Sequence, residues 1–249
     1  MSDDRAPRGA AHSDDPVICA AKLTKQFGAR KAVDRLSFEL PQGAFLSVFG
    51  SNGAGKTTLM RMLATLARPS TGTLRVCGCD AVQDPELLRA RVGLVSHSPM
   101  LYPDLTAEEN LVFYAKLYGV PNPQQRALEL LDAVGLKSRR LDRVKTFSRG
   151  MTQRCSIARA LVNSPALVLL DEPYSGLDPR AAQRLDELIA DVRQDRSFVM
   201  VSHDISKGLQ LASHVLVMER GRQLFFGTAD ACTPAALREL CGGFQGGAA

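Results

Sequence analysis

The stretch GSNGAGKTT, residues 50–58, fits the pattern G-x-x-x-x-G-K-[ST]. The apolar run FLSVF, residues 45–49, precedes it, and residues 56–67 carry apolar side chains on one helical face. Glycines let such a backbone curl until successive N–H groups point at an anion, and the new helix adds its positive end. The pattern therefore predicts a phosphate-binding loop made by Gly50, Ser51, Asn52, Gly53, Ala54, Gly55, Lys56, Thr57 and Thr58.

Residues in and beyond this loop indicate a nucleotide that carries β- and γ-phosphates, bound together with Mg²⁺. Lys56 supplies a mobile cation for the β- and γ-phosphates, and the Thr57 hydroxyl is a ligand for Mg²⁺. The apolar run ALVLLDE, residues 166–172, ends in two acids. Asp171 is predicted to hold the Mg²⁺ shell and Glu172 to accept a proton from the attacking water. Alone this strand end would be a plain exit into a loop, but beside a phosphate loop it indicates nucleotide hydrolysis.

The composition is that of a globular protein. Of 249 residues, 45% are hydrophobic and 23% charged, which argues against wholesale disorder or an integral membrane protein. Apolar runs such as residues 166–170 are far shorter than the roughly 18 residues that cross a bilayer. The formal charge of +5 is not concentrated in a basic run, so a solvated surface is favoured over a nucleic-acid interface. The six cysteines have no metal or disulfide spacing, and we expect a cytoplasmic chain with reduced thiols.

Strand-like and helical patterns alternate on both sides of a helical middle. Near-continuous apolar strands alternating with helices predict a buried parallel sheet with helices on both faces. The middle is amphipathic and helical, and Thr106 is a candidate cap for one of its helices. The strand-like segments are residues 17–23, 32–40, 44–50, 73–78, 91–97, 166–173, 197–204 and 214–226, and a further helix is expected at about 180–194.

The stretch FSRGMTQR, residues 147–154, resembles the signature of ABC-type ATPases, usually written LSGGQ followed by a Q-R pair. Chain order also matches that family: phosphate loop, helical insert, signature, Asp-Glu strand, SGLD at residues 175–178 and VSHD at residues 201–204. The resemblance implies an α/β phosphate-loop NTPase with an N-terminal antiparallel β subdomain, a parallel-sheet core and an inserted helical subdomain. The implied domain plan is a disordered leader at 1–16, the ATPase domain at 17–230 with its insert at about 98–160, and a C-terminal helix and flexible tail at 231–249.

The same resemblance implies roles for further residues. Phe27 matches the aromatic residue that stacks on adenine. Ser148 and Gly150 would bind the γ-phosphate held by a second copy, although Ser148 is equally a simple helix cap. Asp178 would communicate across the dimer, and His203 would contact the γ-phosphate, although a histidine at a strand end is more often structural. The implied assembly is an ATP-dependent, head-to-tail homodimer, with the signature acting in trans through Ser148, Arg149, Gly150 and Met151.

Three positions depart from the family pattern. Arg149 stands where glycine is usual, and Met151 where glutamine is usual, so the polar contacts of the signature are altered. His97 stands where the family has a catalytic glutamine that links Mg²⁺ and water to the transport partner. Imidazole still donates or accepts a hydrogen bond, but less flexibly. We therefore expect slower or more partner-dependent hydrolysis.

Several strings narrow the subfamily. VSHSPMLY at residues 95–102, FYAKLY at 113–118, FSRGM at 147–151 and DEPYSGL at 171–177 resemble the ATP-binding subunit of the haem exporter of cytochrome c maturation. Exporters of drugs or polysaccharide share much of this pattern and stay open as the alternative. The resemblance implies a separate integral membrane permease, docked near residues 98–140, and a peripheral position on the cytoplasmic face of the inner membrane.

Two other classes of function compete. A soluble ABC ATPase acting on ribosomes or DNA generally carries two cassettes or a coiled-coil insertion. This chain has one cassette and no sustained heptads, so no nucleic-acid partner is expected. A small-molecule kinase would leave the signature unexplained and would work as a monomer.

Overall fold

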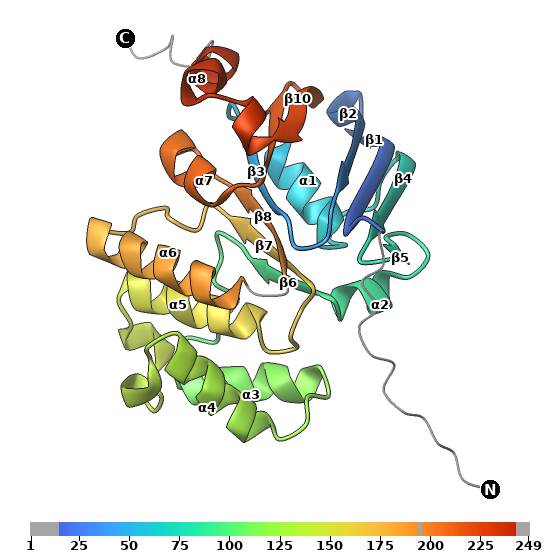
Figure 1. Ribbon diagram of the computed structural model, residues 1–249. Helices are drawn as coiled ribbons and strands as arrows, with labels where there is room; N and C mark the ends of the chain where they lie inside the picture. Colours follow the sequence, from blue (N-terminus) through green and yellow to red (C-terminus); the bar gives the residue numbers. More distant parts are fainter. Residues whose placement is uncertain (1–14, 194–195, 243–249) are drawn as a thin grey trace, which may run out of the picture.

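The computed structural model describes residues 15–193 and 196–242. Residues 1–14 of the expected leader and 243–249 of the expected tail lie outside the described residues. A six-stranded sheet has the order β10-β9-β3-β8-β7-β6, and a four-stranded antiparallel sheet has the order β2-β1-β4-β5. Both sheets are visible in Figure 1. This is the expected combination of an antiparallel β subdomain with a mainly parallel core.

The central strands of the six-stranded sheet are apolar on both faces, as is typical of a parallel sheet that is covered on both sides. Strands β6 (Val92–Val95), β7 (Leu167–Asp171), β8 (Ser197–Val201), β3 (Phe45–Gly50) and β9 (His214–Glu219) pair in parallel. Side chains alternate along β7, where Leu167 and Leu169 join one core cluster and Val168 and Leu170 the other.

One edge of this sheet differs from the sequence-based prediction. Residues 214–226 were expected to be one strand-like segment, but they form a hairpin of β9 and β10 (Arg222–Thr228). Arg220 and Gly221 both have positive φ, at 46° and 83°, which reverses the chain in a two-residue turn. The last strand is therefore antiparallel.

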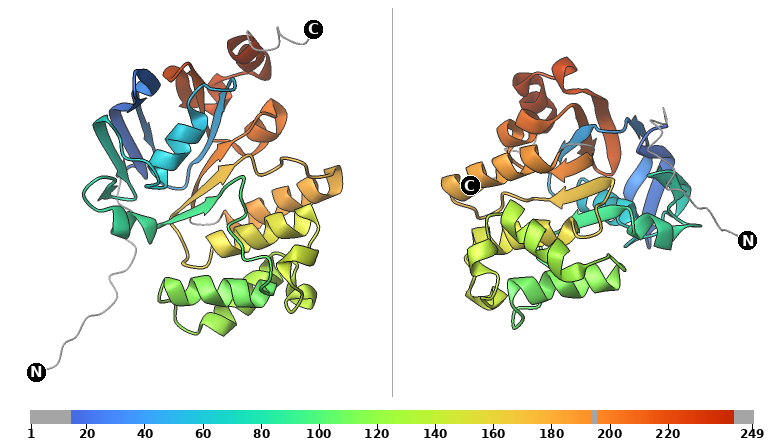
Figure 2. Two further views of the ribbon diagram at one scale, coloured as in Figure 1. Left: turned by 180° about the vertical axis from the view of Figure 1, so that it is seen from behind. Right: turned by 60° about the horizontal axis from the view of Figure 1, so that its bottom comes forward.

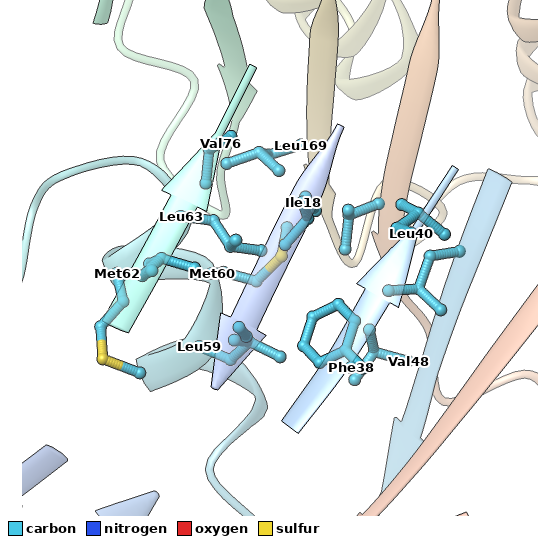
Figure 3. Packing of buried hydrophobic residues seen from close by; sticks show 14 of the residues in the cluster. Ile18, Phe38, Leu40, Val48, Leu59, Met60, Met62, Leu63, Val76 and Leu169 are labelled. Atoms are coloured by element: carbon cyan, nitrogen blue, oxygen red, sulfur yellow. The ribbon is translucent and has the colours of Figure 1, made fainter. Parts of the chain in front are cut away.

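Helix α1 (Lys56–Leu63) packs between the two sheets (Figure 3). The antiparallel sheet consists of β1 (Ile18–Phe27), β2 (Arg30–Leu40), β4 (Thr71–Val76) and β5 (Cys79–Asp80), followed by α2 (Pro85–Arg89). The helix was expected to reach residue 67 but ends four residues earlier. Thr65 adopts φ 60°, and the N–H groups of Thr65 and Leu66 turn back to the carbonyls of Met62 and Arg61, which closes the helix end.

The helical middle covers the other face of the six-stranded sheet and lies away from the antiparallel sheet in both views of Figure 2. Thr106 starts its first helix with a full capping box, since Glu109 N–H donates to its hydroxyl and its own N–H donates to the Glu109 carboxylate. The elements are α3 (Ala107–Leu117), α4 (Pro123–Ala133), α5 (Arg149–Ala160) and the 3₁₀ turns Lys137–Arg139 and Val144–Thr146.

The remaining elements complete the core. They are α6 (Pro179–Val192), α7 (Ile205–Leu211), a 3₁₀ turn at Ala229–Ala231 and α8 (Pro234–Gly242). Helices α5 and α6 pack on β7 and β8 through buried leucine, isoleucine and alanine side chains. Within the described part of the chain, no helix is both long enough and apolar enough to span a bilayer.

Candidate functional site

At two positions of the loop after β3, the backbone conformation and the neighbouring atoms leave room only for glycine. Gly50 has φ 149°, and a Cβ there would lie 2.2 Å from the carbonyl oxygen of Met218. Gly55 has φ 103°, and its Cβ would lie 2.2 Å from the carbonyl oxygen of Ala32. The loop is thus pressed between β9 and β2, and any side chain at either position would force the backbone apart.

Lys56 closes the curl of this loop. Its side chain is buried, and Nζ donates to the carbonyl oxygens of Gly50 (2.7 Å) and Ser51 (2.9 Å). The ammonium therefore lies at the N-terminal end of α1, whose first N–H groups carry partial positive charge. Two positive features gather at one point, as phosphate binding requires.

A pocket of about 380 Å³ opens from the loop. Phe27, 55% exposed, lies on its wall, and the Lys25 ammonium is 4.9 Å from the centre of its ring. Most of the predicted loop lines this pocket, with Arg30 and Ala32, which sequence reasoning missed because they belong to no motif. The lining is Phe27, Arg30, Ala32, Asn52, Gly53, Ala54, Gly55, Lys56, Thr57, Thr58, Glu172 and His203.

Glu172 and His203 meet at the edge of this pocket. Their side chains touch with Oε1 and Nε2 2.7 Å apart. They come from the ends of the neighbouring strands β7 and β8, where Glu172 N–H also donates to the carbonyl of Val201 (3.0 Å). Glu172 has φ 52°, an uncommon conformation for a residue with a side chain.

Asp171 ends β7 beside this pair. Burial raises the pKa of its carboxyl, the nearby Glu172 raises it further, and His97, Lys56 and His203 oppose the rise. Two acids, a lysine and two histidines thus gather at one sheet edge. The oxygen donors of Thr57 and Asp171 are of the chemical kind that Mg²⁺ prefers, with substrate phosphate and water as further ligands.

His97 is exposed and, among the described residues, stands outside the lining of this pocket. The chain after it is fixed to the helical middle, since the Ser156 hydroxyl donates to the Pro99 carbonyl (3.0 Å) and the Tyr114 hydroxyl to the Met100 carbonyl (2.6 Å). Asn110 also accepts from Tyr102 N–H (2.8 Å). This segment therefore joins the end of β6, which precedes His97, to α3 and α5.

The signature residues line a second hollow, of about 270 Å³, at the starts of α5 and α6. Ser148 caps α5 by accepting from Met151 N–H (3.3 Å), and Asp178 caps α6 by accepting from Ala181 N–H (2.8 Å). The Arg149 guanidinium lies over Gly176, where a Cβ would meet it at 2.3 Å. The lining is Ser148, Arg149, Gly150, Met151, Arg154, Gly176, Leu177, Asp178, Arg180, Ala181 and Arg184.

The two hollows are separate within one chain. Among the residues that the structure describes, none lines both. The first gathers most of the glycine-rich loop, the Glu172 carboxylate and His203, whereas the second offers two helix starts and four arginines. Structure therefore brings together the phosphate loop, Phe27, Glu172 and His203, and keeps Ser148, Arg149, Gly150, Met151 and Asp178 apart from them.

Comparison with known proteins gives consistent results. The family model described as ABC transporter matches residues 33–175. The Nod factor export ATP-binding protein I of Paraburkholderia xenovorans is 38% identical, with 84% of this chain and 70% of that protein covered. The bacitracin transport ATP-binding protein of Bacillus licheniformis is 37% identical, with 84% and 68% covered. A dimeric ATP-binding cassette in a post-hydrolysis state, bound to ADP and phosphate, superposes with a TM-score of 0.76 at 25% identity, covering 85% of this chain and 98% of that one.

Proposed function

The chain belongs to the ABC transporter family as an ATP-binding subunit, and we propose that it hydrolyses ATP to power a membrane exporter. The observation that carries the proposal is the meeting of Glu172 and His203, 2.7 Å apart, beside the glycine-forced phosphate loop. A loop that binds phosphate, with a carboxylate at its edge, is suited to hydrolysis of the γ-phosphate bond.

The residues of the first hollow divide the work of binding. Phe27 offers a ring face to the adenine, the N–H groups of residues 52–58 receive the phosphates, and the Lys56 ammonium neutralises the β- and γ-phosphate charge. The hydroxyl of Thr57 and the carboxylate of Asp171 would hold Mg²⁺. The metal, when bound, supplies positive charge that neutralises the transferring phosphoryl group.

Glu172 is the proposed general base. Its carboxylate accepts a proton from a water molecule as the water oxygen attacks the γ-phosphorus. The bond between that phosphorus and the β–γ bridging oxygen breaks, and ADP and phosphate leave. His203 Nε2, held beside Glu172, is placed to donate to a γ-phosphate oxygen, and His97 is proposed to orient the water from the exposed side.

A second copy of the chain is proposed to complete the site. The starts of α5 and α6 supply N–H groups and arginines, but they lie away from the first hollow of the same chain. A head-to-tail homodimer would place Ser148, Arg149, Gly150 and Met151 of one copy over the γ-phosphate held by the other, with Asp178 at the contact. The dimeric assembly of the similar cassette supports this arrangement.

The membrane partner is proposed to be a separate permease that docks on the helical middle. Met100 and Tyr102 are exposed, whereas Leu101 between them packs on the core, so the segment presents part of its apolar surface outward. Tyr102 stacks edge-on with Phe113 of α3, 5.1 Å away and also exposed. The proposed location is the cytoplasmic face of the inner membrane.

The cargo expected from the sequence is haem, and it stays a prediction. The names of the two relatives refer to Nod factor export and bacitracin transport, which favours the alternative, an exporter of drugs or polysaccharide. We rank this alternative first. Loss of haem export in a strain lacking this chain would restore the first expectation.

The experiment is co-purification from native cells. Tagged Glu172→Gln protein is isolated with ATP from gently solubilised membranes, with tagged Lys56→Ala protein as the matched control. A stoichiometric polytopic membrane protein with the first and not the second is the expected result. Recovery with ribosomes or DNA, and no membrane protein, would contradict the exporter function and leave the ATPase site intact.

A further inference from the structure

A polar cluster joins the segments that follow Glu172 and His203 to α6, outside the residues assigned to binding or chemistry. The Tyr174 hydroxyl donates to Asp186 Oδ1 (2.6 Å), and the Lys207 ammonium pairs with the other oxygen of the same carboxylate. Lys207 also lies over the Tyr174 ring, 5.7 Å from its centre. One carboxylate thus joins a phenol and an ammonium, which in turn contact each other.

The three residues come from three different segments. Tyr174 follows Glu172 by two residues in the loop after β7, and Lys207 follows His203 by four residues in the first turn of α7. Asp186 lies in the middle of α6, which runs beneath both strand ends (Figure 1). The cluster therefore ties the loop that carries Glu172 and the helix that follows His203 to one common support.

The cluster is well shielded from water. The Asp186 side chain is 13% exposed and that of Lys207 31%. Burial, followed by the hydrogen bond to Asp186, raises the pKa of Tyr174, so the phenol stays a neutral donor. Breaking either interaction of a partly buried carboxylate costs free energy, because the group that loses its partner stays shielded from water.

The neighbouring backbone needs such a support. Glu172 adopts φ 52°, which costs a non-glycine residue free energy and persists only where the surroundings hold it. Its loop has a tight turn, in which Ser175 N–H donates to the Glu172 carbonyl (3.1 Å) and Leu177 N–H to the Tyr174 carbonyl (3.1 Å). His203 itself is exposed, so its position depends on the segment that carries it.

We propose that Tyr174, Asp186 and Lys207 form a positioning clamp that keeps Glu172 and His203 in contact for hydrolysis. The inference rests on the proposed function, since it concerns the same base. None of the three residues touches the substrate; each acts through the two residues at the pocket edge. A base displaced by about 1 Å can cost up to about 100-fold in rate, because proton transfer and attack need close alignment.

The first test is steady-state hydrolysis by the full chain carrying Lys207→Met, Tyr174→Phe or Asp186→Asn. We expect kcat to fall about 10-fold in Lys207→Met, with KM for ATP within about twofold of wild type, because binding contacts are unchanged. Lys207→Arg keeps a cation within reach and should restore most of the rate. Arg89→Met, which removes an ion-paired cation from α2, is the control and should leave both constants unchanged.

The second test follows the contact between Glu172 and His203 by NMR, without measuring ATP hydrolysis. The sequence has four histidines, so the ring nitrogen signal of His203 can be assigned in a long-range ¹H–¹⁵N spectrum by its loss in His203→Gln. We expect the His203 Nε2 signal to move in Lys207→Met and Tyr174→Phe, and to stay in place in Arg89→Met.

An unchanged His203 signal in both clamp variants overturns the inference, whatever happens to turnover. A lowered thermal midpoint with unchanged kcat overturns it as well, since the cluster would then serve stability alone. If wild-type protein hydrolyses no ATP, the proposed function fails, and the His203 signal alone decides whether the clamp exists.

Discussion

The two hollows of this molecule differ in the backbone elements that form them and in the charge of the side chains that line them. The phosphate-loop hollow stands at the carboxyl ends of parallel strands, and its backbone is fixed by two glycines at which an added Cβ would lie 2.2 Å from a carbonyl oxygen. The signature hollow stands at two helix starts and is lined by four arginines and one aspartate. The first is lined by the Glu172 carboxylate, the proposed base, and by His203, whereas the second offers N–H groups of helix starts and positive charge. We propose that the two hollows, contributed by two copies of the chain, complete each other in one hydrolytic site.

We expect the largest effect, a loss of ATP affinity, when the positive charge of the first hollow is removed. Lys56→Ala deletes an ammonium held at the loop by two carbonyls. We expect ATP affinity to fall by about 100-fold or more, equivalent to about 2.7 kcal/mol, because charge-assisted contacts to phosphate are lost. Isothermal titration with ATP measures this. Affinity within a few-fold of wild type would remove Lys56 from the phosphate site.

The second effect separates chemistry from binding. Glu172→Gln keeps the shape of the side chain but cannot accept a proton. We expect kcat to fall about 1,000-fold while ATP still binds. Size-exclusion chromatography with ATP should then show a dimer that wild type shows only transiently. Normal hydrolysis by Glu172→Gln would assign the base to another residue.

The third effect concerns the exposed link between the hollow and the helical middle. His97→Ala removes a ring that opposes the rise in the pKa of the Asp171 carboxyl, and we expect turnover to fall about threefold, with His97→Gln changing it as well. Steady-state hydrolysis with and without the membrane partner measures both. Unchanged rates in both variants would show that His97 has no part in hydrolysis.

The smallest effect is one of stability, and it depends on pH. The raised pKa of Asp171 means that the folded state disfavours the carboxylate. The folded chain therefore bears a cost above this raised pKa, and the cost disappears as the carboxyl is protonated at lower pH. Asp171→Asn should raise the thermal midpoint at pH 7.5 by about 2 °C or less, and by nothing at pH 4. An equal rise at both pH values would contradict this cause.

Most of the fold and of the first hollow could be predicted from local patterns. The glycine spacing at residues 50–55 and the apolar run that ends at Asp171 each encode their structure within a few residues, so the sequence alone indicates them. The end of α1 was predicted too late, because its apolar face continues past residue 63 while Thr65 turns the backbone. The reversal at Arg220 and Gly221 was missed for the same reason: apolar residues continue on both sides of the turn.

Contacts between distant residues could not be predicted. Arg30 and Ala32 reach the pocket because β2 packs beside the loop, and nothing in their neighbours indicates this. The contacts of Asp186 with Tyr174 and Lys207 span 12 and 21 residues. In the sequence of an amphipathic helix, an aspartate that pairs with distant residues looks the same as one that faces water. The structure is needed to tell the two apart.

The central claim, that two copies share each hydrolytic site, is tested most directly by mixing two inactive variants. Lys56→Ala disables the first hollow. Ser148→Asp should disable the second, because it sets a negative charge against the γ-phosphate. Aspartate is also a good helix cap, so the start of α5 should be preserved.

Each variant alone should hydrolyse no ATP. An equal mixture should regain about a quarter of wild-type turnover, since half of the dimers are mixed and each of these holds one intact composite site. A mixture that stays inactive at every ratio, while Ser148→Asp protein still binds ATP, would contradict the shared site. Full activity of Ser148→Asp alone would contradict it as well.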